Sequence, residues 1–244
     1  MIAAAPRVSL PVYRLTLRSL FSGRRVLALA LLALVPVVAA TAFASAGEIE
    51  PDLFWARLLQ RLAIPTITAF IAVVIGGSAI GDEREDGTIL YLASTPLSRL
   101  TLVLSKVAAA WTATMALLAP AVVASGAIAL GDEATAAQIA WPLLGVALAA
   151  LCYCAVASWL AMVVRRPVVI GVLYILLWEG SIATFAASAD RFSIAAYGRA
   201  IAVEGVIDVN APETAPAAAA VVLLAVTALA TWAAARRMTR TELP

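Results

Sequence analysis

Histidine is absent from this chain of 244 residues, and charged residues make up only 13% of it. Without histidine, the chain lacks the commonest general base and metal ligand of proteins. Ser-His-Asp triads, Cys-His pairs and histidine metal sites are therefore excluded within it. The only cysteines, Cys152 and Cys154, stand two residues apart in an apolar run and point to different sides of a helix. We expect them to face lipid or pack against neighbouring helices, not to form a disulfide or a metal site.

Hydrophobic residues make up 64% of the chain, whereas soluble proteins have about 45–50%. The charges gather in short islands between uncharged stretches, and a helix needs about 20 apolar residues to cross a bilayer. The stretches of about this length are residues 26–46, 62–80, 106–130, 137–163, 167–187 and 215–235. Such runs are too long for membrane β-strands, which need about 9–11 residues. The sequence therefore predicts an all-α integral membrane protein with six transmembrane helices in one domain, residues 1–244.

The basic residues predict the orientation of these spans. With a cytoplasmic N-terminus, 13 of the 17 arginines and lysines lie on the cytoplasmic side and 4 on the outer side. Basic residues prefer the cytoplasmic side of short loops, so both termini are expected there. One alternative remains open, because Arg24–Arg25, an apolar run and Ala44–Ala46 resemble a secretory signal with its cleavage site. That run is, however, longer than the about 7–15 residues of a signal core.

Residues 8–22 precede the first span and form a predicted amphipathic helix. Its apolar residues are Leu10, Tyr13, Leu17, Leu20 and Phe21. Arg14 and Arg18 share the opposite side, one turn apart. Such a helix suits the headgroup layer of a membrane. A basic flank that only sets the orientation of the first span is the plainer interpretation.

Residues 82–99 form the one large cytoplasmic loop of this topology. The residues that we single out in and after it are Asp82, Glu83, Glu85, Gly87, Thr88, Thr95, Pro96, Arg99 and Lys106. The acidic residues follow the second span, and Gly87 allows a break. Thr95 suits a helix N-cap and Pro96 the first helical position, so we expect the third span to continue from there. A solvated turn followed by a helix start is the plainer interpretation.

The loop has an acidic cluster before Gly87-Thr88, then Leu-x-x-Thr-Pro-Leu-Ser-Arg over 92–99, and a lysine follows at the next span. This pattern resembles the permeases of ABC-2-type transporters, which have the type V ABC exporter fold. The N-terminal helix is similar to that family's elbow helix. Residues 190–213 are similar to the outer segment, with short extracellular helices, before its last span. The resemblance implies a coupling loop at 82–99 that contacts a separate ATPase subunit. It also implies two permease copies, or two related permeases, and two ATPase subunits in a bacterial or archaeal-type cytoplasmic membrane.

The chain has no Gly-x-x-x-x-Gly-Lys-Ser/Thr phosphate loop, so ATP must be bound elsewhere. ATP and Mg²⁺ are expected in the partner ATPase, and the chain itself is expected to be a transport subunit and not an enzyme. Two other interpretations are an ion-gradient-driven secondary transporter and a non-transporting scaffold for an ATPase. A secondary transporter usually needs several ionisable residues within its spans. The substrate cannot be read from the sequence, although apolar spans slightly favour an amphipathic or lipid-like cargo.

Glu179 is the one ionisable residue that lies deep inside a predicted span. Acids at such depth usually face a protein interior or a wet cavity, because a charge is costly against lipid. In one interpretation Glu179 marks a break of the fifth helix at Gly180 and caps backbone amides there. In the other it faces the dimer axis near the outer gate and contacts cargo or a partner chain.

Overall fold

The computed structural model describes residues 8–46, 50–85, 98–182, 192–206 and 214–240. Helices account for nearly all of these residues and no strand occurs among them, which confirms the predicted all-α fold. Within the described residues, five helices are long and apolar enough to cross a membrane. They are Arg24–Ser45, Pro51–Arg84, Arg99–Leu130, Ala136–Val163 and Pro216–Met238.

The element at the position of the predicted fifth span is shorter. It consists of the helix α9 (Pro167–Tyr174) and the π-helix η3 (Ile175–Ile182), and its apolar part covers Pro167–Trp178. The exact count of six spans rests on this element and stays a prediction. The predicted break at Gly180 is wrong, because η3 continues to Ile182 and an internal glycine costs a helix only about 1 kcal/mol. The side chain of Glu179 lies outside the described residues.

The second span begins earlier than expected. Helix α4 (Pro51–Leu58), the π-helix η1 (Leu59–Thr68) and α5 (Ala69–Glu85) follow one another without a break. The expected outer loop therefore ends at Pro51, because Trp55 is fully buried and holds α4 against the bundle. Pro65 lies within η1 and has no N–H to donate, which the wider π-helical turn accommodates.

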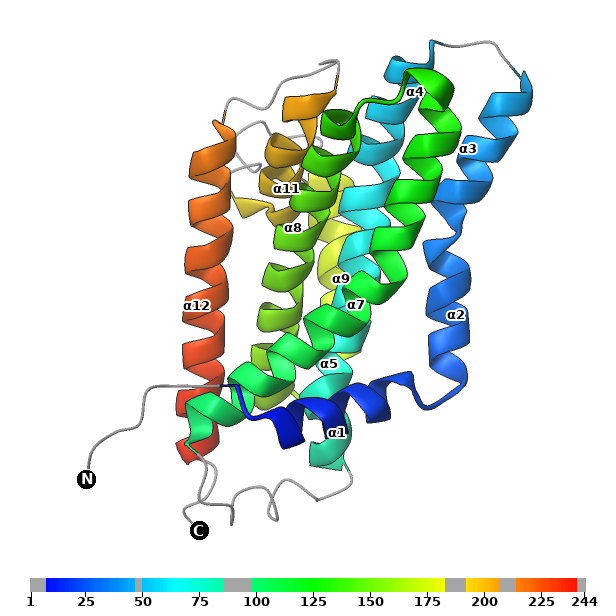
Figure 1. Ribbon diagram of the computed structural model, residues 1–244. Coiled ribbons are helices and arrows are strands. Elements are labelled where there is room, and N and C mark those ends of the chain that lie inside the picture. Colours follow the sequence, from blue (N-terminus) through cyan, green and yellow to red (C-terminus); the bar gives the residue numbers. More distant parts are fainter. Residues whose placement is uncertain (1–7, 47–49, 86–97, 183–191, 207–213, 241–244) are drawn as a thin grey trace.

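Figure 1 shows the long helices side by side, with α1 (Leu10–Phe21) running across one end of the bundle. We call this the α1 end. Helices α2 (Arg24–Ala33) and α3 (Val35–Ala46) make the first long helix, and α4, η1 and α5 make the second. The others are α7 (Arg99–Leu130), α8 (Ala136–Val163) and α12 (Pro216–Arg240). The short helix α11 (Ile194–Ala202) lies beside α8 towards the opposite end. Short helices before the last span are thus present, while their extracellular position stays a prediction.

Helices α5 and α8 pack more closely than side chains usually allow. A Cβ atom on Gly76 would come within 2.7 Å of the Cα atom of Cys154. The hydroxyl of Ser158 donates a hydrogen bond of 3.1 Å to the carbonyl of Gly76. Cys152 and Cys154 are both buried and are not joined in a disulfide, so they are packing residues.

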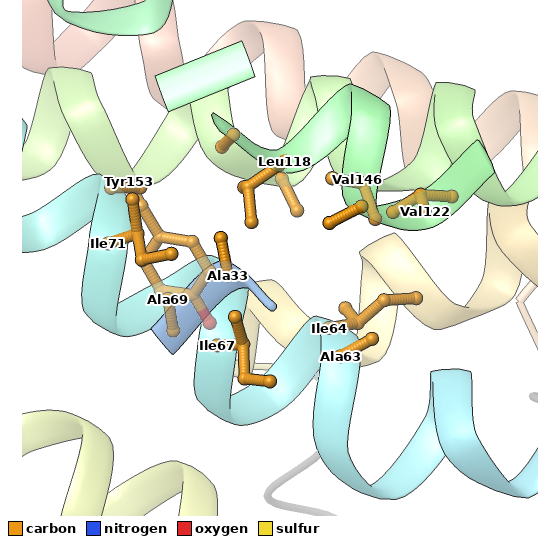
Figure 2. Packing of buried hydrophobic residues seen from close by; sticks show 14 of the residues in the cluster. Ala33, Ala63, Ile64, Ile67, Ala69, Ile71, Leu118, Val122, Val146 and Tyr153 are labelled. Carbon is orange, nitrogen blue, oxygen red and sulfur yellow. The ribbon is translucent and has the colours of Figure 1, made fainter. Parts of the chain in front are cut away.

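Larger apolar side chains fill the rest of the core. Figure 2 shows Ile71 of α5 beside Tyr153 of α8, and Ile67 of η1 below Leu118 of α7. Ile64 of η1 lies across from Val122 and Val146. This cluster runs along the inside of the bundle and includes residues of α2, α7 and α8. The core therefore holds the first four long helices together.

Candidate functional site at the α1 end of the bundle

The last turn of α5 is the place where several helices meet at the α1 end. Asp82, Glu83 and Arg84 follow one another in this turn, and each contacts a different neighbouring element. Asp82 and Glu83 were expected in a loop, but the structure places them in α5, which ends at Glu85. The helix continues through this charged sequence because its side chains find partners on the surrounding helices.

Asp82 forms an ion pair with Arg25 in the first turn of α2. Arg25 Nη2 lies 2.8 Å from Asp82 Oδ2, and Arg25 Nη1 lies 3.2 Å from Oδ1. Arg25 Nη1 also donates a hydrogen bond of 3.0 Å to the hydroxyl of Ser78. The two charged side chains are 55% and 44% exposed, so water screens the attraction and the pair adds little stability.

Glu83 forms a second ion pair with Lys106 of α7, and this one is buried. The Lys106 side chain is only 2% exposed and that of Glu83 22%. Lys106 Nζ also donates a hydrogen bond of 3.0 Å to the carbonyl of Ala79. The apolar residues around the pair are Ile80, Leu102, Val103, Met162 and Met238. Removing both charges from water is costly, so neither charged side chain is stable in this position without its partner.

Arg84 binds the end of α8. Its Nη1 atom donates hydrogen bonds of 2.9 Å to the carbonyl of Ala161 and 3.2 Å to that of Val164. The last carbonyls of a helix have no partner within the helix, and a cation there also complements the helix dipole. The sequence offered no pattern for this role, because Arg84 differs from other basic residues only through these contacts in the fold.

The third long helix starts later than expected. Helix α7 begins at Arg99, and the hydroxyl of Ser98 accepts a hydrogen bond of 3.1 Å from the backbone N–H of Thr101. Ser98 is therefore the N-cap of this helix, in place of Thr95. The predicted residues Gly87, Thr88, Thr95 and Pro96 lie outside the described residues, as does the side chain of Glu85. Arg99 is half-buried in the first turn.

Helix α1 is present where the amphipathic helix was expected. Val12 and Thr16 are its buried residues, and Ser9 N donates a hydrogen bond of 2.7 Å to the hydroxyl of Ser105 in α7. Arg14 and Arg18 are exposed, as expected. Leu10 and Phe21 of the expected apolar face are exposed too, as a face that contacts lipid would be, and this role stays a prediction. The side of α1 that contacts α7 is centred on Val12 and Thr16.

At the opposite end of the bundle, hydrogen bonds from uncharged side chains join two helices. Trp55 Nε1 donates a hydrogen bond of 3.1 Å to the carbonyl of Gln138, and Gln138 Nε2 donates one of 2.9 Å to Asp52. Gln138 and Thr135 form a capping box at the start of α8. These contacts join α4 to α8.

Comparison with known families adds one finding to this geometry. The model of the family described as ABC-2 family transporter protein matches residues 24–185, which is more than half of the chain. The matched range starts at α2, includes the last turn of α5 and ends just after η3. No curated protein matches the chain significantly.

Proposed function

Because the chain belongs to the ABC-2 family of transporter proteins, we propose that it is the permease subunit of an ATP-binding-cassette exporter. Two permease copies, or two related permeases, would assemble with two copies of a separate ATPase subunit. That subunit would bind ATP and Mg²⁺, since this chain has no phosphate loop. The chain would then convert the movement of its partner into passage of a substrate across or out of the membrane.

One observation carries the coupling part of this proposal. Residues 86–97 separate α5 from α7, and the turn directly before them contacts α2, α7 and α8. A force applied to residues 86–97 would therefore act on three long helices at once. This supports a role for the segment as the contact with the ATPase. Nucleotide binding would close the ATPase pair and shift the last turn of α5, and the helices joined to it would follow.

The first prediction concerns the partner. The tagged chain, isolated from native membranes, is expected to carry an ATPase of the ATP-binding-cassette class, two copies for each two permeases. After the partner is removed, the chain is expected to bind no nucleotide, measured by photolabelling with an azido derivative of ATP. Labelling of the isolated chain would contradict the assignment.

Charge reversal locates the contact in the same complex. The variant Glu85→Lys/Asp86→Lys is expected to weaken assembly or to separate ATP hydrolysis from transport. Glu83 is unsuitable for this purpose, because it also holds Lys106 in place. Asp132→Lys, at the opposite end of the bundle, is the control and should leave assembly unchanged. Full coupled transport by the double variant would show that residues 85–86 are not part of the contact with the ATPase.

The second prediction concerns orientation. The 13-to-4 division of basic residues supports a cytoplasmic position for the α1 end and both termini. Asp132→Cys should therefore react with a membrane-impermeant maleimide in intact cells, and Arg166→Cys only after the cells are opened. The unsubstituted chain is the control, because Cys152 and Cys154 are buried. Reaction of Arg166→Cys in intact cells would reverse the proposed orientation.

A further inference from the structure

We propose that the corner between α1 and α2 binds the headgroups of anionic phospholipids. We call Arg14, Arg18 and Arg24 the corner arginines. All three are exposed, and among the described residues no ion pair joins them to an acid. The first acidic residue of the chain is Glu48, so the sequence around the corner carries positive charge only. This inference goes beyond the proposed function and does not depend on it.

The backbone brings the corner arginines to one place. Helix α1 ends at Phe21, and Gly23 turns the chain with a φ of 136°, which favours glycine over residues with a side chain. Arg24 then opens α2, which leaves the corner as the first long apolar helix. Figure 1 shows α1 across the end of the bundle and α2 rising from its end.

The apolar surface around the arginines indicates a membrane, and not water or a soluble protein. Leu10 and Leu15 on the exposed side of α1 are 55% and 64% exposed, and Phe21 is 43% exposed. Leu27 and Leu31, on α2 just beyond Arg24, are each 68% exposed. An exposed helix with basic and apolar residues is typical of the boundary between headgroups and acyl chains. The corner arginines therefore lie where the apolar surface of α2 begins.

A contact on α12 also indicates that the α1 end of the bundle lies at the level of the lipid headgroups. The guanidinium carbon of Arg236 lies 4.0 Å from the ring centroid of Trp232, and Trp232 is 48% exposed. Tryptophan is enriched at the interface between membrane and water, where its ring lies at the headgroup level. The preceding exposed residues of α12 are apolar, among them Leu224 and Leu229. Two separate helices thus mark the headgroup layer at the α1 end.

Charge selects the kind of lipid. Arginines bind phosphate with charged hydrogen bonds, and each basic residue near an anionic surface strengthens binding by roughly fivefold. The acids described at the α1 end, Asp82 and Glu83, are already paired with Arg25 and Lys106. They therefore do not neutralise the corner. A phospholipid with a net negative headgroup fits this surface better than a zwitterionic one.

Native mass spectrometry of the purified full chain tests the proposal. Equal amounts of phosphatidylglycerol and phosphatidylcholine are added, and retained lipids are counted. The unsubstituted chain should retain mainly phosphatidylglycerol, and Arg14→Gln/Arg18→Gln should lower this retention by roughly 25-fold, about fivefold for each arginine. Arg57→Gln/Arg61→Gln removes two exposed arginines with the same spacing at the opposite end, and should retain as much lipid as the unsubstituted chain. Arg14→Lys/Arg18→Lys keeps the charge and should bind normally.

Two results would overturn the proposal. Equal loss of phosphatidylglycerol in both glutamine variants would show that net charge alone governs retention. Unchanged lipid retention in Arg14→Gln/Arg18→Gln, with loss of the ATPase partner, would show that the corner is a protein interface. Thermal unfolding of each variant checks the fold, which should not change because these side chains are exposed.

Discussion

Replacing Lys106 by methionine should lower the stability of the protein by up to about 3–5 kcal/mol, because it leaves Glu83, whose side chain is only 22% exposed, without its cation. Methionine fills nearly the same volume as the lysine stem, so the packing with Leu102 and Met238 is kept. What is lost is the ion pair with Glu83 and the hydrogen bond to Ala79 O. Thermal unfolding followed by tryptophan fluorescence should show a fall in Tm of about 10 °C.

Two further variants separate the buried pair from a general effect of charge. Lys106→Met/Glu83→Gln removes both charges and should recover much of the lost stability, because no buried ion remains. Arg25→Gln breaks the neighbouring exposed pair with Asp82 and should cost less than about 1 kcal/mol. Equal falls in Tm for Lys106→Met and Arg25→Gln would contradict the prediction that the less exposed ion pair contributes more to stability.

The second large effect is expected at Gly76, where α5 and α8 touch. In Gly76→Ala the added Cβ would lie 2.7 Å from the Cα of Cys154 and 2.8 Å from its carbonyl oxygen. Both are backbone atoms, so the two helices must move apart. Overpacking of this kind costs about 1–3 kcal/mol, and we expect a fall in Tm of about 5 °C or more.

Gly81→Ala is the matched control for this effect. Both glycines lie in α5, so alanine improves helix propensity equally at the two positions. A Cβ on Gly81 would lie 3.4 Å from Pro167 Cγ, an ordinary contact. Gly81→Ala should therefore leave Tm unchanged or raise it slightly. Identical Tm values for Gly76→Ala and Gly81→Ala would show that the close approach of α5 and α8 does not limit stability.

The helical fold could be predicted from the sequence, because uncharged apolar runs of about 20 residues suit membrane-spanning helices. They are too long for the strands of a membrane β-barrel. Boundaries were less predictable where tertiary contacts decide them. The second long helix begins at Pro51 because Trp55 is buried against α7 and α8, and its indole N–H reaches Gln138 O. No local pattern reveals that contact. The residue types of Thr95-Pro96 predict a helix start there, whereas Ser98 caps the long helix.

The candidate site could be predicted in part. The charged sequence from Asp82 and the lysine at 106 were recognised, and the structure joins Glu83 to that lysine. Their positions at helix ends could not be predicted from the sequence. Whether such a charged segment forms a helix or a loop depends on partner residues that are distant in the sequence. Arg84 was missed for the same reason: its acceptors, Ala161 O and Val164 O, are backbone atoms that could belong to any sequence.

The three consecutive contacts of α5 limit how this protein can move. Asp82, Glu83 and Arg84 occupy less than one helical turn of about 3.6 residues, so they form one rigid body. A rotation or shift of that turn changes the distances to α2, α7 and α8 together and cannot be adjusted for one of them alone. A movement of the end of α5 is therefore transmitted to three helices at once. Bundle motions at this end should be concerted, with few intermediates in which one helix has moved and the others have not.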